Sequence, residues 1–146
     1  MNPRGLSARS LILMAEDDED DRVLVRDAFA EARLPGEIRF VADGQDLLDY
    51  LRRAGTDQAE RPQIVLLDLN MPRKDGREAL AEMKADEELC EIPVVVLTTS
   101  TDQEDIKGSY CLGASSFITK PVSHAGLVDV MRDLTDYWFR LVELPG

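Results

Sequence analysis

The segment IVLLDLNMPRKDG, residues 64–76, gives the strongest indication of the fold. It begins with four consecutive apolar residues, Ile64–Leu67, and no polar side chain alternates with them. Such a run is typical of a strand at the centre of a parallel sheet, because helices cover both faces of that sheet. The run ends at Asp68, and the segment Met71–Gly76 contains turn-forming Pro and Gly residues. The stretch therefore predicts a buried central strand followed by a loop.

Similar short apolar runs recur on both sides of this stretch. Between them lie longer stretches in which apolar residues recur at helical spacing. The five runs are Leu11–Ala15, Ile38–Val41, Ile64–Leu67, Val94–Leu97 and Phe117–Ile118. Five strands, each followed by a helix, predict one α/β domain with a parallel sheet.

The length and composition also indicate a single domain. The chain has 146 residues, of which 44% are hydrophobic, so it can bury a core. We expect residues 1–9 to form a flexible N-terminal tail and residues 10–146 to form one domain. Its last helix is expected to extend over about 123–143, with Ser123 as a helix N-cap.

Charge and hydropathy exclude two classes of partner. The net charge of −12 gives an acidic surface that repels phosphate backbones, so we expect no direct binding to nucleic acid. No apolar run approaches the roughly 20 residues needed to span a membrane, and LILMA is too short for a signal peptide. Cys90 and Cys111 have no CxxC spacing, and we expect two buried or half-buried free thiols in a reducing cytoplasm.

Polar residues follow the ends of four predicted strands. Glu16 and Asp17 follow the first strand, Asp68 the third, Thr98 the fourth and Lys120 the fifth. The carboxyl ends of parallel strands lie at one edge of a sheet, where open α/β sheets bind ligands. The sequence therefore predicts that acids, a hydroxyl and a lysine converge on one site.

Three carboxylates within a few ångströms of one another repel unless a cation relieves them. Mg²⁺ suits this role, because it takes carboxylate and phosphate oxygens as ligands. We expect Glu16 and Asp17 to hold the metal, and Asp68 beside it to attack phosphorus as a nucleophile. The remaining acids, residues 18–21, are expected to form a solvated first helical turn capped by Asp18.

The segments ILMAEDDEDD, LLDLNMPRKDG, PVVVLTTS and SSFITKPV together resemble the receiver domain of two-component response regulators. The resemblance covers nearly the whole chain from about Leu11. It implies a doubly wound, flavodoxin-like sheet of five strands in the order 2-1-3-4-5, with helices on both faces.

The resemblance also assigns roles to individual residues. It implies that Asp68 is the phosphoacceptor, Thr98 the switch hydroxyl, Lys120 the phosphate-pairing lysine and Phe117 the switch aromatic. The implied Mg²⁺ ligands are Glu16, Asp17, Asp68 and the main-chain carbonyl of Asn70. The Lys120–Pro121 bond is implied to be cis.

Three residues depart from the family pattern. Glu16 stands where many members have Asp, and Phe117 lacks the hydroxyl of the Tyr that is often found there. Thr99 is larger than the small residue common at its position, and we expect it to narrow access to the phosphate. These departures leave the lifetime of the phosphorylated form open.

The C-terminal stretch DLTDYWFRLVELPG, residues 133–146, is similar to the end of small single-domain regulators that partner bacterial and cyanobacterial phytochrome kinases. That resemblance implies a homodimer through the last helix region. Residues 137–139 are three adjacent large side chains, which point in different directions around a helix. Either Trp138 and Leu141 complete the core while the others lie scattered, or the cluster forms a patch for self-association or a kinase.

Together these residues indicate a signalling switch rather than a metabolic enzyme. A sensor histidine kinase, phytochrome-type on the resemblance, would phosphorylate Asp68, and the readout would be protein contact or relay to a histidine phosphotransfer protein. The chain would catalyse only its own phosphorylation and slow dephosphorylation. The phosphoryl-donor histidine must come from another protein, because His124 is the single histidine and is expected to be exposed.

Two other functions compete with the switch. One is an aspartyl-phosphate phosphatase of the haloacid dehalogenase type, which needs a second Asp where this chain has Asn70. The other is a receiver-fold interaction module that is never phosphorylated, against which the intact set of Asp17, Asp68, Thr98 and Lys120 argues.

Overall fold

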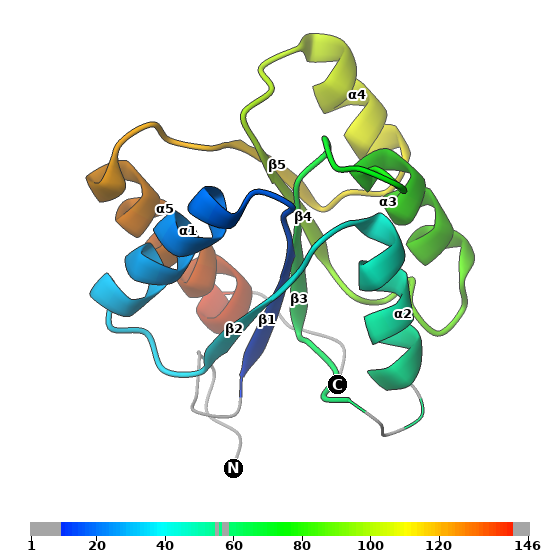
Figure 1. The fold of residues 1–146 in the computed structure, drawn as a ribbon, viewed down its shortest axis with the longest axis horizontal. Coiled ribbons are helices and arrows are strands. Elements are labelled where there is room, and N and C mark those ends of the chain that lie inside the picture. Colours follow the sequence, from blue (N-terminus) through cyan, green and yellow to red (C-terminus); the bar gives the residue numbers. More distant parts are fainter. Residues whose placement is uncertain (1–9, 55, 57–58, 142–146) are drawn as a thin grey trace.

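The computed structural model describes residues 10–54, 56 and 59–141 and contains a parallel sheet with helices on both faces (Figure 1). The expected tail, residues 1–9, and residues 142–146 lie outside the described residues. The elements in chain order are β1 (Leu11–Ala15), α1 (Glu19–Glu31), β2 (Glu37–Val41), α2 (Gly44–Ala54), β3 (Ile64–Leu67), α3 (Gly76–Ala85), β4 (Val94–Thr98), α4 (Gln103–Cys111), β5 (Ser116–Thr119) and α5 (His124–Asp136).

The strand order is β2-β1-β3-β4-β5 with every pair parallel, which confirms the predicted fold. The three central strands, β1, β3 and β4, are buried along their whole length, as expected of strands covered on both faces. Ala15 of β1 pairs with Leu67 of β3, which in turn pairs with Val96 of β4. This register brings the residues after β1 and β3 to the same edge of the sheet.

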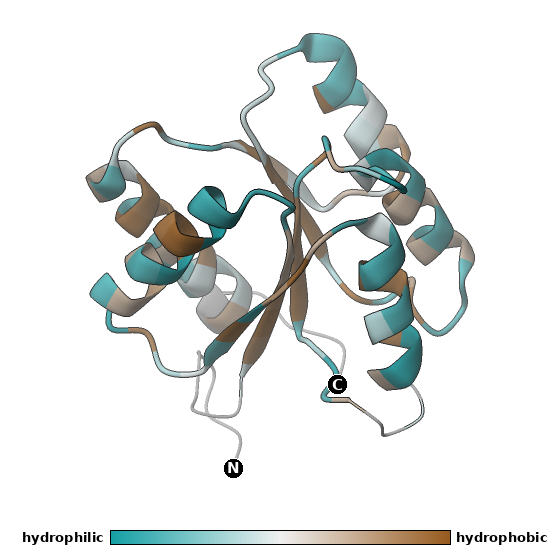
Figure 2. Cartoon of the chain, in the orientation of Figure 1, coloured by the Kyte–Doolittle hydropathy of each residue, from teal (hydrophilic) through white to brown (hydrophobic). Residues whose placement is uncertain are grey.

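Alternate residues of the central strands feed two separate cores. Leu13 and Leu67 belong to the core beneath α2 and α3, whereas Met14 and Leu66 belong to the core beneath α1 and α5. Figure 1 shows these two groups of helices on opposite sides of the sheet. In Figure 2 the strands at the centre are largely hydrophobic, whereas the helices around them carry both hydrophilic and hydrophobic residues. Burial of both faces fixes the strands that carry the candidate site residues.

The last helix changes its geometry before it ends. Ser123 is its N-cap, as predicted, and the Ser123 hydroxyl accepts a hydrogen bond from the Gly126 amide at 3.0 Å. The α-helix ends at Asp136, and a π-helical turn follows over Tyr137–Leu141. The Thr135 hydroxyl donates back to the carbonyl of Met131 at 2.9 Å, a bond that commonly bends helices. The expected helix therefore continues to Leu141 in altered form, and residues 142 and 143 lie outside the described residues.

The π turn sorts the three large side chains of the C-terminal cluster. Phe139 is buried in the α1–α5 core, Trp138 is half-buried against it, and Tyr137 is exposed. The rings of Tyr137 and Trp138 meet edge to face with centroids 5.2 Å apart.

Two expectations about single residues are wrong. Cys90 and Cys111 are free but exposed, because Cys90 lies in the turn that follows α3 and Cys111 is the last residue of α4. The Lys120–Pro121 bond is trans, since the described residues contain no cis peptide bond, and an X–Pro bond favours trans by only about 0.5–1 kcal/mol. No helix among the described residues is long and apolar enough to cross a bilayer.

Candidate functional site

The residues that follow the strands converge at one edge of the sheet, as predicted. Glu16, Asp17 and Asp68 each offer a carboxylate oxygen, and these oxygens lie within 4.8 Å of one another. Lys120 reaches the same place from the end of β5, and Thr98 from the end of β4. The sequence therefore predicted correctly that these residues lie together, and their roles stay a prediction.

Glu16 is the most enclosed of the three acids. It is 1% exposed, and its Oε2 accepts the amide of Asp18 at 3.2 Å, while its Oε1 pairs with the ammonium of Lys120. Arg22 holds the end of β1 by donating from Nε to the carbonyl of Glu16 at 2.7 Å. Burial raises the pKa of Glu16 to about 7, although the hydrogen bond from Lys120 acts in the opposite direction.

Asp68 is held by donors on one of its oxygens. Its Oδ1 accepts the hydroxyl of Thr98 at 2.8 Å and the amide of Asn70 at 3.4 Å. Its Oδ2 lies 3.8 Å from Nζ of Lys120. Because the donors gather on Oδ1, the carboxylate is fixed in orientation while Oδ2 faces the cationic side of the site.

Lys120 is bound more closely to other acids than to Asp68. Its side chain is 7% exposed, and its Nζ donates to Glu16 and, at 3.2 Å, to Asp21. Burial lowers the pKa of Lys120, but the hydrogen bond to Glu16 and the nearby charges outweigh burial, so the net shift is upward.

The expectation that residues 18–21 are simply solvated is therefore wrong for Asp21. Asp18 is the N-cap of α1, as predicted, and its Oδ1 accepts the amides of Asp20 and Asp21. Asp21, however, is not simply solvated, because helix geometry turns its side chain toward Lys120. Sequence reasoning missed this contact, because Asp21 lies five positions after Glu16 and the phase of the helix could not be predicted.

The loop after β3 is fixed by residues that sequence reasoning did not identify. Arg73 adopts a φ of 60° and donates from Nε to Asp43 at 2.6 Å and from a terminal nitrogen to Asp46 at 2.6 Å. The bond from Arg73 holds the pKa of the buried Asp43 below its usual value, against the raising effect of burial. The amide of Gly44 also donates to the carbonyl of Lys74 at 2.8 Å. These contacts join the loop that follows Asp68 to the start of α2.

Phe117 lies on the edge strand β5, half-buried against the core beneath α2 and α3. Its amide donates to the hydroxyl of Tyr110 at 3.2 Å, so α4 is tied to β5 at this point. The loop after β4 is held separately, because Ser100 and Arg77 both donate to the carboxylate of Asp105.

A mouth of about 250 Å³ opens beside Lys120. Leu24 and Val122 at this mouth are exposed, and Val23 close by on α1 is exposed as well. Thr99 is exposed and lines the same opening.

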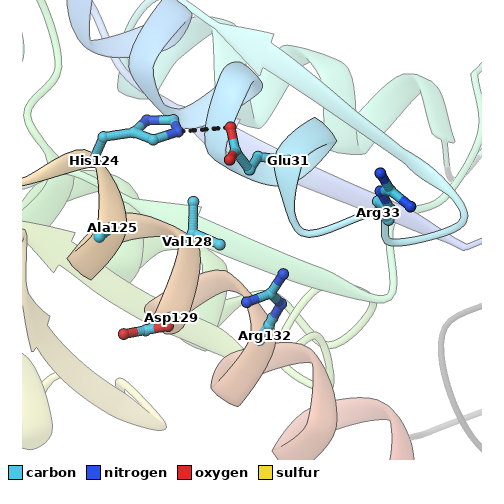
Figure 3. Close-up of a pocket in the computed structure, with 7 residues that line it drawn as sticks. All are labelled: Glu31, Arg33, His124, Ala125, Val128, Asp129 and Arg132. Carbon is cyan, nitrogen blue, oxygen red and sulfur yellow. Dashed lines mark hydrogen bonds and ion pairs between the residues drawn. The ribbon is translucent and has the colours of Figure 1, made fainter.

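A larger hollow, about 590 Å³, lies between α1 and α5 and does not include the carboxylates. Figure 3 shows His124 pointing across it toward Glu31, with Nε2 and Oε2 3.1 Å apart. His124 is exposed, as expected. This hollow lacks the convergence of acids and lysine that the strand ends supply, so it is not the candidate site.

The donor set fits a hard divalent cation. Three carboxylate oxygens within one cation's reach are typical ligands for Mg²⁺ or Mn²⁺. Neither thiols nor the histidine take part, so a softer metal is not favoured. Asn70 follows on the loop after Asp68, where a main-chain carbonyl could complete the set.

Comparison with known proteins gives the same picture. The model of the response regulator receiver domain matches residues 12–132. The chain is 38% identical to the probable methanogenesis regulatory protein FilR2 of Methanothrix harundinacea, over 93% of this chain and 88% of that protein. It is 37% identical to response regulator Rcp1 of Synechocystis, over 93% of each.

Solved structures of two such proteins superpose closely. The phosphorylated cyanobacterial phytochrome response regulator RcpA matches with a TM-score of 0.86 and 40% identity, covering 94% of this chain and 99% of that one. The Mn²⁺-bound form of Rcp1 matches with a TM-score of 0.82 and 36% identity, with the same coverage.

Proposed function

Because this chain belongs to the response regulator receiver domain family, a family of signalling modules rather than metabolic enzymes, we propose that Asp68 accepts a phosphoryl group from a sensor histidine kinase. The observation that carries this proposal is the convergence of Glu16, Asp17, Asp68 and Lys120 at one edge of the sheet. No other cluster of this kind occurs among the residues described by the structure.

The chemistry follows from the two sides of the Asp68 carboxylate. An Asp68 oxygen attacks the phosphorus of a phosphohistidine, the P–N bond breaks, and the histidine nitrogen leaves with the bonding electrons. Lys120, 3.8 Å from Asp68 Oδ2, is placed to pair with a phosphoryl oxygen, and the Thr98 hydroxyl can turn from Asp68 to another. Mg²⁺ held by Glu16, Asp17, Asp68 and the carbonyl of Asn70 would offset the charge on the transferred group.

The mouth of the site suits a protein donor. Leu24 and Val122 are exposed apolar side chains that line the opening beside Lys120, and a helix that carries the donor histidine could cover them. We assign the donor to a phytochrome-type kinase, because RcpA is a phytochrome response regulator and its structure covers nearly the whole of this chain. Such a kinase uses ATP, and we therefore propose that the kinase and this chain meet in the cytoplasm.

Phosphorylation would be read at the face of α4, β5 and α5. When Thr98 turns toward the phosphoryl group it leaves Asp68, and Phe117 on the neighbouring strand β5 is free to repack against α4, where its amide contacts Tyr110. Because Phe117 has no hydroxyl, this change is one of packing alone. The output is a contact with another protein, with a histidine phosphotransfer protein as one candidate receiver.

The phosphoryl transfer can be tested with a small donor. Incubation with acetyl phosphate and Mg²⁺ is expected to add the mass of one phosphoryl group, and chelation of the metal is expected to prevent it. The adduct should decay slowly by hydrolysis. Absence of any adduct would favour the unphosphorylated interaction module, and rapid turnover of many phosphate esters would favour a phosphatase.

We also propose that the chain forms a homodimer through its C-terminal helix region. A groove of about 440 Å³ runs along the α4–β5–α5 face. Its rim includes the exposed rings of Tyr110 and Tyr137, and half-buried Trp138 lies beside them. Aromatic side chains of this kind are enriched at the centres of interfaces.

Trp138→Ala is therefore expected to weaken self-association about 30-fold, which is a typical loss for an interface tryptophan. Sedimentation velocity over a range of concentrations measures the change. Leu24→Ala, at an exposed apolar residue of α1, is the matched control and should leave the dimer intact. An unchanged association constant for Trp138→Ala would exclude this face as the interface.

A further inference from the structure

The ammonium group of Lys120 lies among three carboxylates and is nearly closed off from solvent. It donates to Glu16 and Asp21, and Asp68 lies farther away, at 3.8 Å. An ammonium group has three N–H donors, so two acids can hold it while one N–H remains for a phosphoryl oxygen. The role proposed for Lys120 therefore depends on which acids keep it in place.

Two different partners can bind the carboxylate of Glu16, namely Lys120 and a metal ion. One oxygen pairs with Lys120, and Glu16 is also one of the three acids whose oxygens could hold a cation. A divalent cation at these acids competes with the lysine for Glu16 and repels the ammonium group. If Glu16 were its only anchor, Lys120 would be released at the step that needs it.

We propose that Asp21 is a positioning residue that holds Lys120 at the phosphorylation site when a metal ion engages Glu16. This inference rests on the proposed function of the site. Asp21 Oδ2 lies 3.2 Å from Nζ of Lys120, and Asp21 is absent from the cluster of acids that could share a metal. It can therefore bind the lysine without giving up a metal ligand.

The first turn of α1 is built to hold Asp21 in this position. Its amide donates to the N-cap carboxylate of Asp18 at 3.1 Å, which fixes the backbone of the turn. Arg22, the next residue, donates to the carbonyl of Glu16 and joins the turn to the end of β1. The side chain of Asp21 is partly exposed, so its effect on the lysine is screened but not lost.

Asp20 provides a matched control for the charge of Asp21. It lies in the same helical turn, its amide binds the same cap, and its exposed side chain makes no contact with Lys120. Asp20→Asn and Asp21→Asn therefore remove the same charge from the same end of the helix, and only the second removes a partner of the lysine.

Mg²⁺ affinity, measured by titration calorimetry without any phosphodonor, tests the proposal. Asp21→Asn is expected to weaken Mg²⁺ binding about fivefold. Without Asp21, Lys120 loses the partner that holds it when the metal engages Glu16, and the lost hydrogen bond joins two charged groups at a partly exposed position. Asp20→Asn should weaken it less than about twofold, as expected of a screened charge. In a Lys120→Gln background, the effect of Asp21→Asn should fall to that of Asp20→Asn.

Asp21→Glu, which keeps the charge, should recover most of the affinity, and thermal melts in chelator check that all variants are folded. Equal effects of Asp20→Asn and Asp21→Asn would overturn the proposal, as would an undiminished effect of Asp21→Asn in the Lys120→Gln background. Acetyl phosphate labelling of the wild type distinguishes failure of the role proposed for Asp21 from failure of the function proposed for the site. If the wild type is labelled but the effects of Asp21→Asn and Lys120→Gln on Mg²⁺ affinity simply add, only the role of Asp21 is overturned. If the wild type is neither labelled nor binds Mg²⁺, the proposed function is overturned as well.

Discussion

Asp68→Asn is expected to lower the rate of phosphoryl uptake from acetyl phosphate by more than about a thousandfold, which is the size of loss that removal of a nucleophile causes in enzymes. The amide that replaces the carboxylate has nearly the same shape. Its oxygen can still accept the hydrogen bond from the Thr98 hydroxyl, which lies 2.8 Å from Oδ1 of Asp68 in the wild type. The fold should therefore survive, and the loss should come from chemistry, because an amide nitrogen is a poor nucleophile.

Intact-protein mass spectrometry over a time course measures this loss, and peptide mapping of the wild-type adduct locates the phosphoryl group. Asp27→Asn is a suitable control, since Asp27 is an exposed acid on α1 away from the site. It should label like the wild type. An adduct of equal yield on Asp68→Asn would move the acceptor to another acid, and Asp17 would be the first to examine.

The core of this site was predictable because it follows from topology. In a parallel sheet, the residues after the strands share one edge, so Glu16, Asp68, Thr98 and Lys120 could be brought together before any coordinates were known. The apolar runs of β1, β3 and β4 gave the strand bounds to within a residue for the same reason, since full burial leaves no alternation to misread.

The contacts that support the site were not predictable. Asp21 reaches Lys120 across 99 residues of sequence, and Arg73 reaches Asp43 across 30. Which member of an acidic run faces the site depends on helix phase and on the position of another strand. The left-handed backbone of Arg73 also has no sequence signal, because glycine or asparagine is the usual residue at such a φ.

The C-terminal segment shows a different limit. Sequence spacing indicated one long helix with three large adjacent side chains, and either burial or a surface patch was possible. The π turn changes the phase at Tyr137, so Phe139 enters the core while Tyr137 stays exposed. Helical periodicity assumes a constant rotation per residue, and it fails where a turn widens.

Gly76→Ala is expected to cause a large loss of stability, because its added methyl group has no room. A Cβ at Gly76 would lie 2.3 Å from the carbonyl oxygen of Asp68 and 2.8 Å from Cα of Leu69. Both atoms belong to the backbone and cannot rotate away, and the Gly76 amide already donates to the Leu69 carbonyl at 3.0 Å. The start of α3 is therefore in close contact with the backbone of Asp68, the proposed phosphoacceptor, and of Leu69.

We expect Gly76→Ala to lower the free energy of unfolding by roughly 3 kcal/mol, as overpacking of a close contact does. The corresponding fall in melting temperature is roughly 10 °C for a chain of this size. Mg²⁺ affinity should fall with it, because relief of the clash must displace the backbone at Asp68.

Gly108→Ala tests whether the contact, rather than the loss of a glycine, is responsible. Gly108 lies inside α4, is exposed, and has no atom within 4 Å of the position its Cβ would take. Alanine there should raise the free energy of unfolding by about 0.5–1 kcal/mol, because it restricts the unfolded chain and favours the helix. Urea unfolding followed by circular dichroism measures both variants. If the two substitutions changed stability in the same direction, the close approach of α3 to Asp68 would not be what Gly76 is needed for.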